Sequence, residues 1–211
     1  LARQKPGLIP DPAWKRGALN APWVTGETMM AGIGQGFVLA TPLQLAVMTA
    51  RIATGLDIEP RLVRDGLDSP PRDPLELPLR RQWLDVVRAG LLAAVNDGGG
   101  TGGNAALPIA GVMMAGKTGT SQVSKLSRGR SKADLPRRLR DHALFVGYAP
   151  HDRPRYAIAA IVEHGGGGGQ AAAPLARDIM IDVLARDPLG RTPYPELLAA
   201  SPDPVLRRRG I

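Results

Sequence analysis

A cation, two hydroxyl groups and a glycine follow one another in Lys117, Thr118, Gly119 and Thr120. They come directly after the apolar run 112–116 and are followed by no helix-forming sequence. An ammonium group beside hydroxyl groups suits a carboxylate, and glycine lets a ligand approach the backbone closely. The pattern predicts a strand whose rim receives a carboxylate-bearing, peptide-like ligand.

Residues 111–118 also satisfy the phosphate-loop pattern G-x-x-x-x-G-K-[ST], which is the signature of a nucleotidase. Such a loop needs a strand before its first glycine and a helix that begins at the Lys-Thr pair. Pro108 interrupts the apolar run before the pattern, and the strand candidates 142–149 and 155–163 are joined by a hairpin-length turn. A hairpin makes these strands antiparallel, whereas the phosphate-loop fold is parallel. The strand interpretation is therefore favoured.

The composition fits one globular domain, or the greater part of one, since 44% of the 211 residues are apolar. There is no cysteine, so disulfides and thiolate metal sites are excluded, and the 3 histidines lack ligand spacing. We therefore expect neither a metal nor another cofactor. No apolar run approaches the length of a membrane span. The chain starts at Leu1, and we expect this start to be cut rather than natural.

The net charge of +8 is concentrated in residues 125–140 and in 207–209. Two interpretations of the basic run 125–140 stay open, a solvated loop between two strands and attraction to an anionic cell-envelope surface. No aromatic residue interleaves with it to stack on bases, so we predict no binding to nucleic acid.

Hydrophobic periodicity predicts three helices. The first, over 43–54, has a hydroxyl cap at Thr41 and a proline at its start, and it is expected to be buried on most faces. The second and third, over 80–97 and 173–186, each have a predicted apolar face. These faces are Trp83, Val86, Val87, Leu91, Ala94 and Val95 for the second helix, and Leu175, Ile179 and Val183 for the third, with Pro174 in its first turn.

Strand 155–163 is apolar on both faces, which predicts an α/β fold with an antiparallel sheet covered by helices on both faces. The glycine run 165–169 is interpreted either as a flexible turn into the last helix or as a loop that contacts a ligand. Residues 1–30 are expected to be extended and turn-rich, with Trp14 and Trp23 as packing anchors. We place a domain over 1–187 and a proline-rich basic tail over 188–211.

Several segments, in this order, resemble the C-terminal part of the transpeptidase domain of penicillin-binding proteins. The chain is most similar to the elongation-type class B branch, penicillin-binding protein 2. Lys-Thr-Gly is the third element of this family's set, after Ser-x-x-Lys and a Ser-Asp-Asn-type element. The resemblance implies an incomplete serine β-lactamase/transpeptidase-like fold. The matching segments are 22–28, 32–36, 40–45, 115–123, 139–142 and 162–165.

The resemblance implies a peptidoglycan D,D-transpeptidase that cross-links stem peptides during cell-wall elongation and reacts with β-lactams. It implies the periplasmic face of the inner membrane, an N-terminal anchor outside this sequence and contact with elongation-complex proteins. No serine here stands three residues before a lysine, and Ser-x-Asn is absent. We therefore expect a fragment that lacks the nucleophile and is inactive alone. A β-lactam sensor or β-lactamase of the same fold is the alternative, disfavoured by the matches at 32–36 and 41–45.

The resemblance also implies roles for individual residues. Lys117 would supply positive potential, and the substrate would be bound at Thr118, Gly119 and Thr120, with the two hydroxyls receiving its carboxylate. The N–H of Thr120 would be one oxyanion donor. Three further family positions have open roles.

Gln35 bonds either backbone or substrate, and backbone is favoured. Asp141 and His142 stand where the basic run re-enters the sheet, so they either anchor this loop or supply a general base, and anchoring is favoured.

Overall fold

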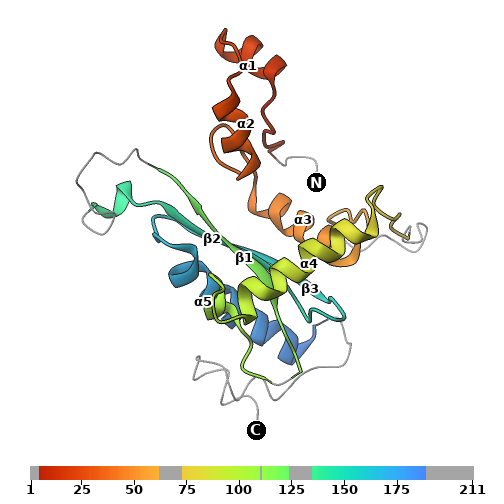
Figure 1. Ribbon diagram of the computed structural model, residues 1–211. Helices are drawn as coiled ribbons and strands as arrows, with labels where there is room; N and C mark the ends of the chain where they lie inside the picture. Colours follow the sequence, from red (N-terminus) through yellow and green to blue (C-terminus); the bar gives the residue numbers. More distant parts are fainter. Residues whose placement is uncertain (1–4, 62–72, 110, 124–134, 189–211) are drawn as a thin grey trace.

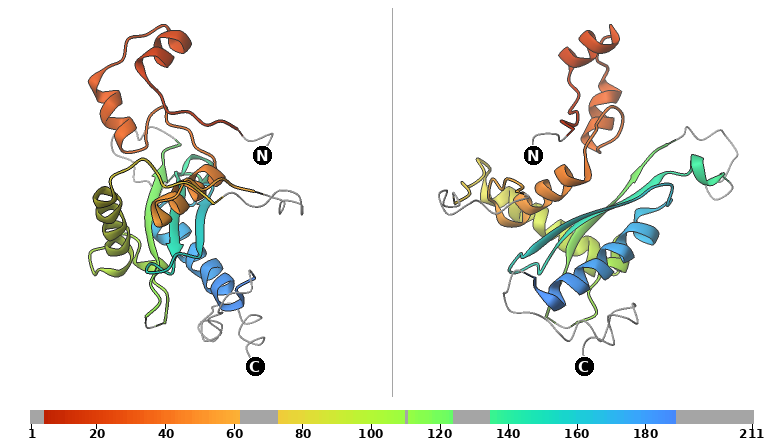
Figure 2. Two further views of the ribbon diagram at one scale, coloured as in Figure 1. Left: turned by 90° about the vertical axis from the view of Figure 1, so that its right-hand side faces the viewer. Right: turned by 180° about the vertical axis from the view of Figure 1, so that it is seen from behind.

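The computed structural model describes residues 5–61, 73–109, 111–123 and 135–188 (Figure 1). Its centre is a three-stranded antiparallel sheet in the order β1-β2-β3. One long helix, α5, lies on one face of the sheet, and α3 and α4 lie on the other (Figure 2). The predicted antiparallel sheet with helices on both faces is confirmed. The bounds are β1 Ala115–Ser121, β2 His142–Ala149, β3 Tyr156–Val162, α3 Pro42–Thr54, α4 Arg81–Asn96 and α5 Gly168–Arg186.

Strand β1 carries the Lys-Thr-Gly-Thr segment as predicted, and it continues to Ser121 without a helix at Lys117. In its register with β2, Lys117 lies opposite Val146 and Gly119 lies opposite Leu144. Strands β2 and β3 form the expected antiparallel hairpin. A phosphate loop needs a helix where this strand continues, so the phosphate-loop alternative is wrong.

Helix α5 begins at Gly168 rather than at residue 173, so it includes part of the glycine run, and Pro174 lies inside the helix instead of in its first turn. A Cβ atom on Gly168 would lie 2.4 Å from the carbonyl oxygen of Leu144 and 2.5 Å from that of Gly119. Gly168 is therefore part of the helix rather than of a flexible turn. Its missing side chain lets the start of α5 pack directly on β1 and β2.

The apolar face predicted for α5 is wrong. Leu175 and Ile179 are each 43% exposed, while small alanines and larger residues on another side are buried against the sheet. Apolar residues lie all around this helix, so hydrophobicity alone does not select the buried face. Alanine lets the helix axis approach the sheet closely, which favours the observed side. The buried residues are Ala172, Ala173, Ala176, Met180, Ile181, Leu184 and Ala185.

The two ends of helix α3 follow the prediction. The Thr41 hydroxyl accepts from the N–H of Gln44 at 3.2 Å, the Gln44 side chain accepts from the N–H of Thr41 at 2.8 Å, and Gly55 ends the helix with a φ of 76°. Burial on most faces is not observed, because Met48 is 44% exposed. The buried residues of α3 are Thr49 and Ala53.

Helix α4 has nearly the predicted length, but its buried side differs from the prediction over the first two turns. Trp83, Val86 and Val87 are exposed and Leu84 is buried in their place, whereas Val95, near the end of the helix, is buried as predicted. The prediction therefore had the correct helix and, in its first two turns, the wrong face.

Residues 5–40 form an N-terminal arm that stands away from the sheet (Figure 1). It contains two helices that were not predicted, α1 (Pro12–Leu19) and α2 (Thr25–Gly32). The side chain of Asp11 caps α1 by accepting from the N–H of Trp14 at 2.7 Å. Both tryptophans do make contacts, as expected. The Trp14 ring lies 5.2 Å from that of Phe37, and Trp23 donates to the Thr28 hydroxyl at 2.8 Å.

The end of α5 is tied to the start of β3. Asp187, the C-cap residue, is buried, accepts a hydrogen bond from the Tyr156 hydroxyl and lies 3.3 Å from the Arg155 guanidinium. Beyond residue 188, the predicted tail lies outside the described residues. The same holds for 124–134 of the basic run, whose described end contains the short helix η3 (Arg137–Leu139).

Candidate functional site at the edge of β1

The Lys-Thr-Gly-Thr segment lies on an edge strand, because β1 pairs with β2 on one side and with no other described strand. Lys117 is exposed, and the three residues after it are half-buried. The edge is bordered by the loop after α4 and by the loop after α2. Both loops contribute side chains to it.

Three donor groups gather beside β1. The Lys117 ammonium lies 3.2 Å from the Thr118 hydroxyl, 3.5 Å from the Thr101 hydroxyl and 3.0 Å from the Thr118 carbonyl oxygen. The two threonine hydroxyls are 2.9 Å apart. An ammonium with two hydroxyls at these distances can bind a carboxylate oxygen by charge-assisted hydrogen bonds.

Thr101 was missed by the sequence reasoning, which treated residues 98–103 only as a glycine-rich helix stop. The start of α5 packs against this loop, since a Cβ on Gly169 would lie 2.6 Å from the Thr101 carbonyl oxygen. Asn104, in the short helix η1 (Gly103–Ala105), donates to the Gly169 carbonyl at 2.8 Å. A hydroxyl residue inside a glycine loop just before the Lys-Thr-Gly strand was the available signal.

Gln35 reaches β1 from the loop after α2. Its Nε2 donates to the carbonyl oxygen of Thr120 at 2.7 Å, which confirms the favoured prediction that it bonds backbone. The neighbours Gly34 and Gly36 both have a φ of 74°, a conformation that glycine adopts without strain. The positive φ angles turn the loop so that the Gln35 amide meets the strand.

The contact with Gln35 shows which way Thr120 faces. Gln35 lies outside the β1–β2 pair, so the Thr120 carbonyl points to the free edge. In an antiparallel strand the N–H and C=O of one residue point to the same side. The N–H of Thr120 therefore also points to the free edge, and Thr118, two residues earlier, has the same orientation.

Asp141 and His142 contact backbone groups before the basic loop and after β3. Asp141 is buried and accepts from the Val123 N–H at 3.2 Å, while its own carbonyl accepts from the Gly166 N–H at 2.9 Å. His142 Nδ1 accepts from the N–H of His164 at 2.9 Å. These contacts agree with the favoured prediction of a loop-anchoring pair.

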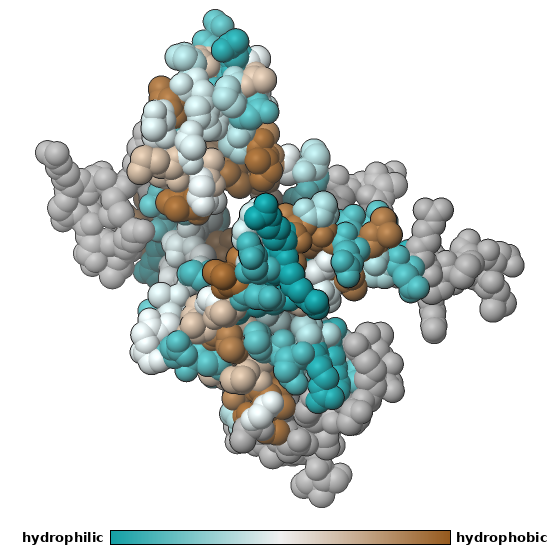
Figure 3. Space-filling model, turned by 45° about the vertical axis from the view of Figure 1, so that its right-hand side comes forward, coloured by the Kyte–Doolittle hydropathy of each residue, from teal (hydrophilic) through white to brown (hydrophobic). Residues whose placement is uncertain are grey.

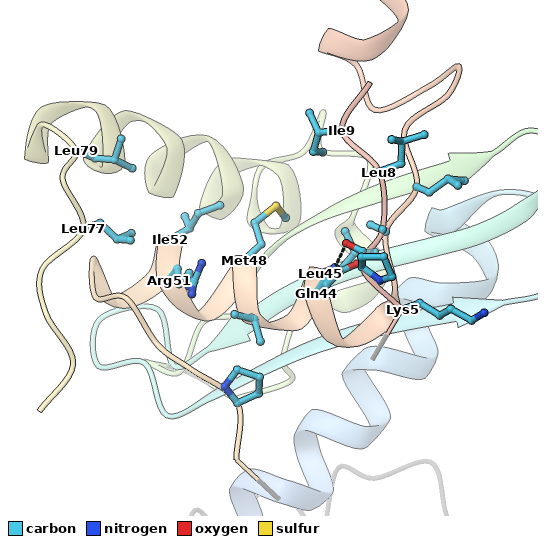
Figure 4. A pocket seen from close by; sticks show the side chains of 16 residues that line it. Lys5, Leu8, Ile9, Gln44, Leu45, Met48, Arg51, Ile52, Leu77 and Leu79 are labelled. Carbon is cyan, nitrogen blue, oxygen red and sulfur yellow. Dashed lines mark hydrogen bonds between the residues drawn. The ribbon is translucent and has the colours of Figure 1, made fainter. Parts of the chain in front are cut away.

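A separate apolar hollow of about 780 Å³ lies between the arm, α3 and the segment before α4 (Figure 4). Its lining contains no residue of β1. Apolar side chains are also exposed along the arm and below it, where they show as brown patches (Figure 3). Examples are Ile9, Met29, Ile33, Leu39 and Leu79.

Two kinds of site are not found in the described part of the chain. No three side chains of His, Asp or Glu gather there as a metal ion would require. No helix of the described residues combines the length and the apolar character needed to cross a bilayer.

Residues 3–181 match the family model of the penicillin-binding protein transpeptidase domain, and the chain belongs to this family. A Haemophilus influenzae relative, peptidoglycan D,D-transpeptidase MrdA, is 36% identical over 82% of this chain and 28% of its own length. The MrdA of Salmonella typhimurium strain LT2 is 34% identical over 93% of this chain and 33% of its own length. The resemblance stated from the sequence is confirmed.

Solved structures agree with this assignment. Pseudomonas aeruginosa PBP2, in complex with WCK 5153, superposes with a TM-score of 0.71 at 38% identity, covering 86% of this chain and 39% of that chain. The Helicobacter pylori complex of PBP2 with MreC gives 0.71 at 30% identity, covering 86% of this chain and 32% of that one. The chain spans about a third or less of its curated relatives, so it is a partial transpeptidase domain.

Proposed function

We propose that this chain works as the C-terminal part, over residues 1–187, of a peptidoglycan D,D-transpeptidase that cross-links stem peptides during cell-wall elongation. The observation that carries the proposal is the group of Lys117, Thr118 and Thr101 on the same free edge as the N–H of Thr120. A carboxylate receptor next to an outward backbone donor suits a substrate with a terminal carboxylate and a reactive carbonyl.

In this proposal a serine supplied by another part of the enzyme attacks the carbonyl carbon of the penultimate D-alanine. The C–N bond to the terminal D-alanine breaks, and the departing amine takes a proton. The amine of a neighbouring stem peptide then attacks the acyl-enzyme, the ester C–O bond breaks and the serine is regenerated. β-Lactams acylate the same serine because they resemble the substrate.

Each residue of the edge has a role in these steps. Lys117 supplies positive potential, and the hydroxyls of Thr118 and Thr120 receive the terminal carboxylate, which passes close to the backbone at Gly119. The N–H of Thr120 stabilises the oxyanion together with the N–H of the serine. Loss of one such donor typically costs about 3–4 kcal/mol of transition-state stabilisation. Thr101 orients the Thr118 hydroxyl through their 2.9 Å contact.

The proposed setting is the periplasmic face of the inner membrane, reached through an anchor outside this sequence. The solved complex of Helicobacter pylori PBP2 with MreC supports an elongation-complex protein as a partner. Relatives from Mycobacterium tuberculosis solved as imipenem and ceftriaxone acyl-enzymes support reaction with β-lactams. The basic segment 188–211 is proposed as an extension of the domain.

The test uses the full-length transpeptidase that contains this segment. Lys117→Ala should lower the rate of acylation by a labelled penicillin at least roughly tenfold, about 1.4 kcal/mol of barrier. The acylation rate of Lys117→Arg should lie between those of Lys117→Ala and wild type, because arginine keeps the charge but replaces a compact ammonium group by a planar guanidinium group. The melting temperature should change little, since substitutions of exposed residues usually stay within about 0.5 kcal/mol.

A strong loss of melting temperature in Lys117→Ala, with acylation per folded molecule unchanged, would make Lys117 structural and the site assignment wrong. The 211-residue chain alone should form no adduct by mass spectrometry. An adduct on one of its own serines would show that the nucleophile lies within this sequence. Rapid hydrolysis of the acyl-enzyme would favour a β-lactamase instead.

A further inference from the structure

We infer that Gln35 is a positioning residue for the oxyanion donor: its amide holds the Thr120 carbonyl, and through it the orientation of the Thr120 N–H. The inference rests on the proposed function, because it concerns the donor that the transpeptidase would use. Neither the family match nor the relatives' names assign a role to this glutamine.

The contact is short, half-buried and joins two distant parts of the chain. Gln35 Nε2 and the Thr120 oxygen are 2.7 Å apart although 85 residues separate the two positions. Thr120 is the second-last residue of β1, so its outward carbonyl has no strand beside it on the free edge within the described chain. An edge carbonyl near a strand end needs a donor from elsewhere, and Gln35 supplies it.

The hydrogen bond from Gln35 to the Thr120 carbonyl matters because the N–H of the same residue is the proposed oxyanion donor. The N–H and the C=O of Thr120 flank one Cα and point in the same direction. If the carbonyl is fixed, rotation about the Thr120 backbone angles is restricted, and the N–H keeps its aim toward the reacting carbonyl. Preorganised donors stabilise a transition state because they need no reorganisation during the reaction.

The Gln35 loop has a firm base in the arm. The backbone N–H of Gln35 donates to the Met30 carbonyl, near the end of α2, at 2.9 Å. Helix α2 is joined to α1 by the Lys15–Glu27 ion pair of 2.5 Å, which is mostly buried, with side chains 11% and 20% exposed. The loop is thus part of a braced helical pair, which suits a residue that must hold another group in place.

A carbonyl oxygen has two lone pairs. Gln35 occupies one, so a ligand N–H can still approach the other, and the tether does not block an extended substrate. The expected effect of losing the tether is therefore on the chemical step rather than on binding.

The experiment measures acylation of the full-length enzyme by a chromogenic penicillin under pre-steady-state conditions, which separates the noncovalent dissociation constant from the acylation rate constant. Gln35→Met keeps the length and removes the donor. It should lower the acylation rate constant about tenfold, less than the 10²–10³ typical of deleting a donor outright, and change the dissociation constant less than about twofold. Gln35→Glu places an acceptor against the carbonyl and should lower the rate constant further.

Gln44→Met is the matched control. Gln44 also donates its Nε2 to a backbone carbonyl at 2.7 Å, but that carbonyl belongs to Pro6 in the arm. This variant should keep the wild-type acylation rate constant per folded molecule. A direct readout comes from the 211-residue chain itself: the ¹³C resonance of the Thr120 carbonyl should shift in Gln35→Met and stay in place in Gln44→Met.

An acylation rate constant in Gln35→Met within about twofold of wild type would overturn the inference. An equal loss of the acylation rate constant in Gln44→Met would also overturn it, because it would indicate general loosening of the arm. If the wild-type enzyme itself is not acylated, the proposed function fails instead. The two failures are therefore distinguishable.

Discussion

The sheet with α5 and the N-terminal arm are stabilised in different ways. The sheet layer has a dry core in which Met114, Phe145, Met180 and other large side chains are at most 2% exposed. Among residues 5–40, only Pro10 and Lys15 are buried. The arm depends on directional contacts, such as the ammonium of Lys15, which lies 2.5 Å from Glu27 and donates to the Pro22 carbonyl at 2.7 Å.

This difference bears on the site because the two regions meet there. The donors of β1 are placed by close packing, which tolerates little change of volume. Gln35 is placed by a polar helical pair, which responds to charge and pH. The edge of β1 therefore combines donors held by close packing with the hydrogen bond from Gln35, whose strength depends on solution conditions.

The largest effect should come from emptying the dry core. Phe145 is fully buried, so Phe145→Ala should destabilise the protein by about 3–5 kcal/mol. The same substitution in the arm, Phe37→Ala, should cost much less because that ring is 38% exposed. Urea denaturation measures both. Similar losses at the two positions would remove the distinction between the regions.

A pair of Gly→Ala substitutions in helices separates close packing from helix propensity. Gly168→Ala should destabilise by about 1–3 kcal/mol, since its Cβ would meet backbone oxygens at 2.4 and 2.5 Å. Gly90→Ala, in α4, has no described atom within 4 Å of the new Cβ and should stabilise by about 0.5–1 kcal/mol. Melting curves of the two variants should move in opposite directions, and a stabilised Gly168→Ala would refute the close contact.

Acid should loosen the arm before the sheet. The pKa of Glu27 is lowered by its hydrogen bond with Lys15 and then by that with the Val24 N–H. A carboxyl whose pKa is lower in the folded state stabilises the fold above its ordinary range of about 4, and this contribution is lost as the pH falls through the folded pKa. The protection of residues 5–40 against hydrogen exchange, taken relative to the intrinsic rate at each pH, should therefore fall at low pH.

Glu27→Gln should remove most of this pH dependence in the arm. Asp152→Asn, which removes an exposed pair with Arg153, is the control and should leave the profile unchanged. An equal loss of protection in the sheet and in the arm would show that the acid response is global and does not arise at Glu27.

The smallest effect concerns a buried hydroxyl in the sheet layer. Within the described structure the Tyr148 hydroxyl is buried without a hydrogen-bond partner, and burial raises the pKa of this phenol. Tyr148→Phe should therefore be neutral or stabilising by up to about 1 kcal/mol. Tyr156→Phe, which loses the bond to Asp187, should destabilise by about 1–3 kcal/mol. A clear loss of stability in Tyr148→Phe would mean that its hydroxyl has a partner.

Features with a local cause could be predicted from the sequence. The cap at Thr41, the stop at Gly55, the hairpin and the strand at Lys117 all depend on neighbouring residues. Asp11 and Pro12 give the same start signal as Thr41 and Pro42, but the surrounding prolines and glycines led to an extended prediction.

Features decided by tertiary packing could not be predicted. The buried faces of α4 and α5 depend on which side meets the sheet, because both helices carry apolar residues on several sides. Thr101 and Gln35 reach the site through contacts with residues 17 and 85 positions away. Local patterns marked Thr101 as a hydroxyl residue in a glycine loop and Gln35 as a residue that bonds backbone, but they did not identify the distant partner of either. Lys117 and Thr118 were recognisable from their own neighbours.

Gly168 and Gly169, at the start of α5, limit how this protein can evolve. A side chain at Gly168 or Gly169 would collide with backbone oxygens. Substitutions at these two positions are therefore a poor route to a changed ligand preference. By contrast, Gly98 and Gly99 face open space in the described structure, and so does Gly34, although its positive φ restricts the choice of residue. With the proposed function, selection for a different acyl donor or for escape from an antibiotic would therefore act first on the two loops that border the edge.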